Sequence, residues 1–115
     1  MKEFFKKLAG MVVTYYANRL YKNAVKEAEK VHALKKERIY VVSSLTNVSN
    51  LVILNRDKFR LMKKALRIQN HYIDNLKEGA WYYTADRAEK NGLSEQDREV
   101  RRLAFVRHML HRAKL

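Results

Sequence analysis

Residues 2–36, KEFFKKLAGMVVTYYANRLYKNAVKEAEKVHALKK, decide the fold, because they contain no proline and a single glycine, Gly10. Their Lys, Ala, Glu and Leu residues favour helix, so the sequence predicts a long helix, with an interruption near Gly10 or Arg19 as an open alternative. If continuous, this helix is about 50 Å long, whereas a compact domain of this size is about 30 Å across. Its N-terminal part is therefore expected to project from the body or to pack on something else.

The apolar residues of this helix change side part-way along. At 100° per residue, one set of large apolar side chains lies on the side away from the first lysines. This set is Phe4, Phe5, Leu8, Met11, Val12, Tyr15 and Tyr16. Beyond Arg19 the apolar residues lie at a second angle around the helix axis, which predicts that they are buried against a second surface. We expect the first set to form an interface with a neighbouring subunit; a bent helix lying on its own core and a cationic segment on a membrane surface are the alternatives.

The rest of the chain predicts a hairpin and two shorter helices. Residues 38–45 and 51–54 are β-branched and apolar, and 46–50 form a turn-like connection. Asn55 or Asp57 caps a helix over about 56–68, and Ser94 opens a helix over about 95–113. Residues 69–93 are predicted to be irregular, with a third strand at 81–84. The predicted fold is a single mostly helical α+β domain over 1–115, in which 1–36 form the long helix and 37–115 the body.

The chain carries a net charge of +13, with 25 Lys and Arg against 12 Asp and Glu. The excess is clustered, at +6 over residues 1–36, +5 over 55–70 and +3 over 94–115. Clustered positive charge raises affinity for polyanions and costs folding free energy through self-repulsion. The sequence therefore predicts an acidic partner, either protein or nucleic acid.

The sharpest cluster lies on the helix predicted over 56–68. Its cations fall within an arc of about 100°, opposite Phe59, Met62 and Leu66. They are Arg56, Arg60, Lys63, Lys64 and Arg67. Like charges at this spacing cost about 0.2–0.5 kcal/mol per pair in an isolated helix, which a bound polyanion would relieve. No base-reading motif is present, so any nucleic-acid contact is expected to be with the backbone.

The last predicted helix repeats this pattern less cleanly. Its polyanion-binding candidates lie beside an apolar arc and are Arg98, Arg101 and Arg112. The apolar arc itself is Leu103, Val106, Met109, Leu110 and Ala113, and Phe105 is expected at the edge of the core.

Catalytic, cofactor and metal sites are not predicted. The chain has no cysteine, no nucleotide-binding loop and no nucleophile elbow. His108 and His111 share a helical face, but Arg107 and Arg112 beside them would repel a metal ion. No run of about 18 apolar residues is present, and the N-terminal apolar run lacks a cleavage site. We therefore expect a non-enzymatic protein without a signal peptide, in the cytoplasm.

Several segments together resemble small proteins of Bacteroidetes and of the crAss-like tailed phages that infect them. These segments are 40–42 (YVV), 51–59 (LVILNRDKF), 81–87 (WYYTADR), 93–95 (LSE) and 101–107 (RRLAFVR). The resemblance covers about residues 38–112 and rests on no catalytic motif. It implies a small virion or phage-associated protein near the head–tail connector, and it assigns no functional residue.

The expected function is that of a basic structural or assembly protein, which binds other protein subunits through its N-terminal helix and acidic protein or nucleic acid through residues 56–67. The alternatives are an accessory or regulatory protein that contacts the phosphate backbone of DNA or RNA, and a peripheral membrane protein. The membrane is the least favoured of these partners.

Overall fold

The computed structural model describes residues 2–44, 47, 50–85 and 92–114. Helix α1 (Lys2–Lys35) is followed by strands β1 (Tyr40–Ser43) and β2 (Leu51–Leu54), and then by helices α2 (Arg56–Leu66) and α3 (Asn70–Glu78). Strand β3 (Tyr82–Tyr83) and helix α4 (Glu95–Arg112) complete the chain. The fold is therefore α+β and mostly helical, as predicted. The connection predicted over 46–50 lies largely outside the described residues.

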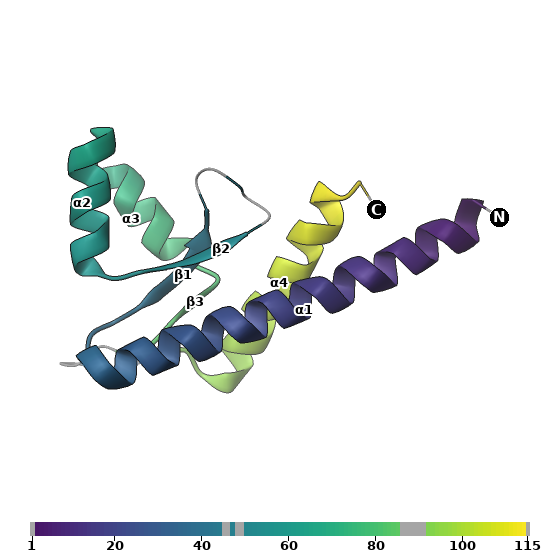
Figure 1. The fold of residues 1–115 in the computed structure, drawn as a ribbon, viewed down its shortest axis with the longest axis horizontal. Coiled ribbons are helices and arrows are strands. Elements are labelled where there is room, and N and C mark those ends of the chain that lie inside the picture. The colour runs from purple at the N-terminus through teal and green to yellow at the C-terminus, as the bar shows by residue number, and fades with distance from the viewer. Residues whose placement is uncertain (1, 45–46, 48–49, 86–91, 115) are drawn as a thin grey trace.

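The three strands form an antiparallel sheet in the order β2-β1-β3. Val41 of β1 lies opposite Ile53 of β2 on one side and Tyr82 of β3 on the other. Side chains of neighbouring residues point to opposite faces of a sheet. Val41 and Tyr82 accordingly join the core with α1 and α4, whereas the ring of Tyr40 packs against Phe59 of α2 at 5.5 Å. The sheet thus separates α1 and α4 from α2 and α3 (Figure 1).

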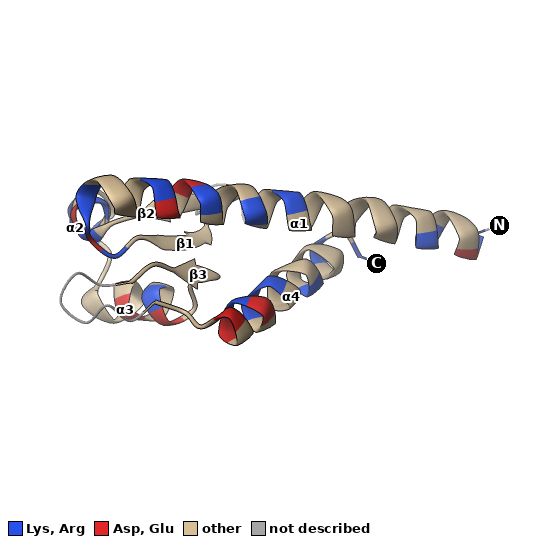
Figure 2. Cartoon of the chain, turned by 90° about the horizontal axis from the view of Figure 1, so that it is seen from below, with Lys and Arg blue, Asp and Glu red and all other residues tan. Residues whose placement is uncertain are grey.

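Helix α1 is continuous over 34 residues, so the interruption considered near Gly10 or Arg19 is absent. Helix α4 crosses its middle, and in both views the N-terminal part of α1 extends past every other element (Figures 1 and 2). The longest dimension of the molecule, 53 Å, matches the length of a helix of this size. The radius of gyration of 15.6 Å exceeds the roughly 13 Å of a compact chain.

The main core lies between the C-terminal half of α1, the sheet and α4. From α1 it takes Ala17, Tyr21, Val25 and Ala28. Phe105 of α4 is fully buried there, with its ring 6.0 Å from that of Tyr21 and 5.4 Å from that of Trp81. The prediction that placed Phe105 at the core edge and Leu103 on the apolar arc is wrong, because Phe105 lies inside the core and Leu103 is exposed. The apolar residues of α4 occupy more than one side, and the rings of Tyr21 on α1 and of Trp81, just before β3, pack against the side with Phe105.

Helix α3 was not predicted from the sequence. Its N-cap residue, Gln69, makes no side-chain capping hydrogen bond, and its first turn carries no acid. Its burial rests mainly on Ile73, and Gly79 follows its last residue. The segment between α2 and β3 is therefore helical rather than irregular.

Candidate binding surfaces

The N-terminal half of α1 exposes an unbroken apolar surface. Seven side chains, each between 47% and 66% exposed, lie on the side of α1 that faces away from the core. We call them the apolar stripe, and they are the predicted interface residues Phe4, Phe5, Leu8, Met11, Val12, Tyr15 and Tyr16. At about 100–150 Å² each, the seven side chains present roughly 700–1,000 Å² of accessible surface. The largest apolar patch on a typical monomer covers about 300–600 Å².

The same outward side of α1 becomes cationic in the next three turns. Arg19, Lys22, Lys26 and Lys30 continue the line of the apolar stripe at helical spacing, and all four are exposed. Figure 2 shows blue bands along the C-terminal half of α1, with red bands of acidic residues among them. We call these four residues the cationic row. The row was not among the predicted binding residues, although the 100° spacing that defines the stripe also defines the row.

Helix α2 carries four of its five predicted cations on one exposed face. Asn55 caps its first turn by accepting a hydrogen bond from the backbone N–H of Lys58 at 2.8 Å. The basic face of α2 is Arg56, Arg60, Lys63 and Lys64. Among the described residues, none of these four side chains forms an ion pair.

The fifth cation, Arg67, lies beyond the end of the helix. Helix α2 stops at Leu66, not at 68 as predicted, and Arg67 adopts a left-handed conformation with φ of 53°. Its backbone N–H donates to the carbonyl of Lys63, which closes the helix. Arg67 is exposed next to the basic face but does not belong to the same helical surface.

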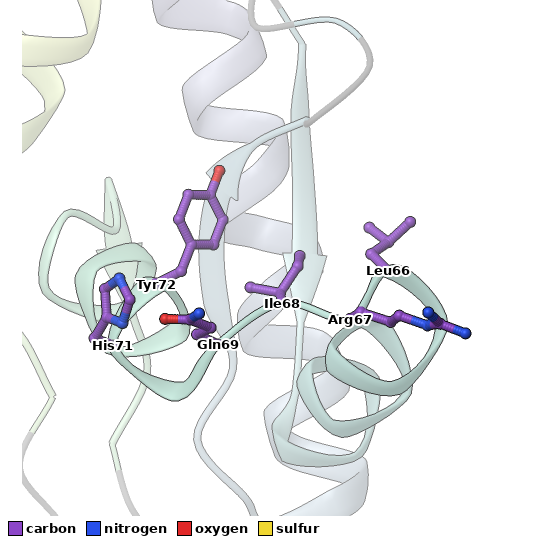
Figure 3. Close-up of a pocket in the computed structure, with 6 residues that line it drawn as sticks. All are labelled: Leu66, Arg67, Ile68, Gln69, His71 and Tyr72. Carbon is purple, nitrogen blue, oxygen red and sulfur yellow. The ribbon is translucent and has the colours of Figure 1, made fainter.

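Exposed leucines border the basic face of α2 on both sides. By helical spacing, Leu61 lies next to Lys64 on one edge of the face, and Leu66 lies next to Lys63 on the other edge. Leu61 is 66% exposed and Leu66 is 58% exposed. Beyond Leu66, an open hollow of about 590 Å³ lies at the connection between α2 and α3. Figure 3 shows Leu66 and Tyr72 on opposite sides of this hollow, with Ile68 between them; Arg67, Gln69 and His71 complete the lining.

The three arginines predicted on α4 do not join the basic face of α2, because the sheet lies between the two helices. Arg101 donates to the carbonyl of Ala80 and lies 5.4 Å from the ring centre of Tyr83. Arg98 lies 5.9 Å from the ring centre of Tyr82, and Arg112 borders a groove between α4 and α1. Arg101 therefore serves the internal packing, and the α4 set does not form a second basic face.

Two tyrosine hydroxyls hold α1 to the sheet. Tyr21 donates to the carbonyl of Trp81 at 2.6 Å, and Tyr82 donates to the carboxylate of Glu29. Burial raises the pKa of Tyr21 to about 12, and nearby arginines of α4 oppose that rise. Burial, together with the hydrogen bond to Glu29, also raises the pKa of Tyr82. Both hydroxyls are therefore protonated at neutral pH and act as hydrogen-bond donors.

The described residues contain no group of three or more His, Asp or Glu side chains that could hold a metal ion. Nor do they include a helix long and apolar enough to cross a membrane. Comparison of the chain with protein-family models, with curated proteins and with solved structures finds no match.

Proposed function

We propose that this protein acts by binding, as a structural or assembly protein whose α2 surface engages an acidic protein partner. The observation that carries this function is the basic face of α2 together with its apolar borders. Four exposed cations stand between Leu61 and Leu66, and the hollow beside Leu66 adds a mixed apolar and polar lining. Protein interfaces combine a contiguous apolar patch with polar and charged residues around it.

Electrostatics explains why the partner is acidic. Arg56, Arg60 and Lys64 follow one another at i,i+4, and such like-charge pairs destabilise a helix. A partner that supplies carboxylates removes this repulsion and gains charge-assisted hydrogen bonds. The acidic surface also speeds association by steering the two molecules together. A place in a phage virion stays a prediction of the resemblance described above.

The test uses affinity capture from the cells that make the protein. The wild-type chain is compared with Arg60→Glu/Lys63→Glu/Lys64→Glu and with Leu66→Gln. A matched control, Lys58→Glu/Arg107→Glu/Lys114→Glu, makes the same change in net charge at exposed positions outside the basic face, with Lys58 on the opposite side of α2. We expect acidic proteins to be retained by the wild type and the control, and to be lost with the first two variants. An identical set of retained proteins in all four samples would contradict the proposed function.

A second candidate function is binding to the phosphate backbone of DNA or RNA. The exposed cations of α2, without ion-pair partners among the described residues, favour it. Four phosphate contacts predict that the logarithm of the affinity for duplex DNA falls with the logarithm of salt concentration at a slope of about −3.6.

Fluorescence anisotropy with unrelated duplexes measures this slope. Leu66→Gln separates the two functions, since it removes an apolar contact with protein but leaves the charge available to phosphate unchanged. Absence of binding to DNA and RNA at 50 mM salt would exclude the second candidate, as would equal losses for the α2 variant and the charge-matched control.

A further inference from the structure

The outward face of α1 is one continuous surface with two chemistries. The apolar stripe covers residues 4–16, about 18 Å along the helix, and the cationic row covers 19–30, about a further 17 Å. Both lie along the same line, since each is centred at nearly the same angle around the axis. A single ligand that contacts this whole face must offer apolar material at one end and negative charge along the rest.

The body of the protein leaves this face unobstructed. The buried residues of α1, including Ala17, Tyr21 and Ala28, lie on its inward side, against the sheet and α4. In Figure 2 the sheet, α3 and α4 lie below α1, and α2 lies at the level of the C-terminal end of α1, so that these two helices form one edge of the molecule. A straight helix at the edge of a molecule can lie along an extended planar surface over its full length.

The charges around the apolar stripe fit a lipid surface. Counted at 100° per residue, Lys2 and Lys7 stand about 110° to either side of the centre of the stripe, where long side chains reach back to lipid headgroups. Glu3 lies about 150° from that centre, whereas Glu29, within the span of the cationic row, lies about 70° from it and accepts a hydrogen bond from Tyr82. An interfacial helix has this arrangement, with Phe, Leu and similar residues in the acyl boundary and lysines on its polar side.

We propose that the outward face of α1 binds an anionic lipid bilayer. The apolar stripe would enter the boundary between headgroups and acyl chains, and the cationic row would rest on the anionic headgroups. Of the candidate ligands, a bilayer with negative headgroups supplies both chemistries over the required length. A nucleic acid offers no apolar layer to the stripe, and a second copy of this chain carries a net charge of +13, which opposes its approach to the row. This membrane function is separate from the proposed function of α2.

The first experiment is sedimentation of the 115-residue chain with vesicles. Vesicles of phosphatidylcholine with 30% phosphatidylglycerol are compared with vesicles of phosphatidylcholine alone. We expect binding to the first and at least tenfold weaker binding to the second. Binding should weaken further between 0.1 and 0.5 M salt, because headgroup attraction is screened. Failure to bind the anionic vesicles at 0.1 M salt would overturn the inference.

Paired variants then identify the surface. Leu8→Glu/Tyr15→Glu changes the stripe, and Leu61→Glu is its control, an exposed apolar residue on α2. Arg19→Glu/Lys22→Glu/Lys26→Glu changes the row, and the Arg60, Lys63 and Lys64 triple variant of α2 is its charge-matched control. Each cation near an anionic membrane contributes roughly fivefold, so the row variant should weaken binding more than 100-fold. Equal losses for a variant and its control would overturn the assignment to α1.

Light scattering distinguishes a membrane from a protein partner on the stripe. If the chain is a dimer that Leu8→Glu/Tyr15→Glu converts to a monomer of 13.7 kDa, and the wild type leaves anionic vesicles unbound, the stripe binds a second copy instead. All variants change exposed residues, and circular dichroism checks that they remain folded. None of these results bears on the capture of acidic proteins by α2, so the two functions stand or fall separately.

Discussion

The two halves of α1 share one continuous helix but are stabilised in different ways. Residues 17–28 direct small and aromatic side chains inward, and Tyr21 is nearly fully buried against Phe105 and the sheet. Residues 4–16 direct larger apolar side chains outward, where the described chain leaves them uncovered. Total hydrophobicity therefore does not identify the core of this helix. The angle of each side chain around the axis decides whether it stabilises the fold or remains available for binding.

Truncating a tyrosine in each half is the strongest test of this difference. Tyr21→Ala removes a buried ring and its hydrogen bond to Trp81, and should lower the free energy of unfolding by about 3–5 kcal/mol. Tyr15→Ala is the matched control and should change it by less than about 0.5 kcal/mol. Urea denaturation at low protein concentration measures both. Similar losses at the two positions would show that the stripe contributes to the core after all.

Alkaline pH should weaken the inward half selectively. The pKa of Tyr21 is about 12 in the folded protein and about 10 when unfolded, so the unfolded chain releases this proton first. Its contribution to stability is thus complete below pH 10 and is lost as the pH rises towards 12. The raised pKa of Tyr82 acts in the same direction. The melting temperature should therefore fall progressively above pH 10.

The phenylalanine variants identify the tyrosines responsible for this loss. Tyr21→Phe and Tyr82→Phe should each flatten the alkaline fall in melting temperature, because neither phenylalanine has a hydroxyl to ionise. Tyr15→Phe is the control, and its profile should follow the wild type. A fall of the same steepness in all three variants would mean that other groups cause it.

Gly10→Ala should strengthen the outward half without altering the core. A Cβ at this position would meet no heavy atom within 4 Å. Alanine favours helix over glycine by about 0.8–1 kcal/mol, so the amides of 4–16 should exchange more slowly with solvent. Ala9→Gly is the reciprocal control and should speed their exchange. If the free energy of global unfolding rises as much as the protection of these amides from exchange, the two halves of α1 unfold as one unit and the expected difference between them is wrong.

The smallest effect is expected where the two halves meet. Arg102 of α4 donates to Asn18 of α1 and also pairs with Glu99, whose pKa this hydrogen bond lowers. The contribution of Glu99 to the stability of the fold is present above the ordinary carboxyl pKa and is lost as the pH falls below that pKa. Because Glu99 is fully exposed, Glu99→Gln should shift the melting temperature by less than about 2 °C. A larger fall would mean that Glu99 positions Arg102 for its bond with Asn18.

Elements with a strong local signal were predictable from the sequence. Asn55 and Ser94 accept the expected hydrogen bonds at the starts of α2 and α4, at 2.8 and 3.2 Å. The long helix follows from its composition, and the strands from their β-branched and aromatic residues. Helix α3 lacks a side-chain cap, and Ile73 is its one buried residue. Tertiary contact, rather than its own sequence, stabilises that helix, so a local pattern could not reveal it.

The candidate surfaces were predictable where helical spacing alone defines them. The exposure of the apolar stripe required the structure, because the same residues could have faced α4. The role of Arg101 was not predictable, since its acceptor, the carbonyl of Ala80, is 21 positions away. Helical spacing likewise could not show that Arg67 would end α2 in a left-handed conformation. A charge count therefore overstates how many cations a partner can reach.

The packing of α4 across α1 also sets an order for folding during synthesis. The inward residues of α1 are made early, yet they find Phe105 and Met109 only after α4 has left the ribosome. The bond from Arg102 to Asn18 joins positions 84 residues apart. Until then α1 presents apolar side chains on both its sides, a condition that favours aggregation. A chain that stops before residue 95 should therefore depend on chaperones, whereas the complete chain covers the inward side itself.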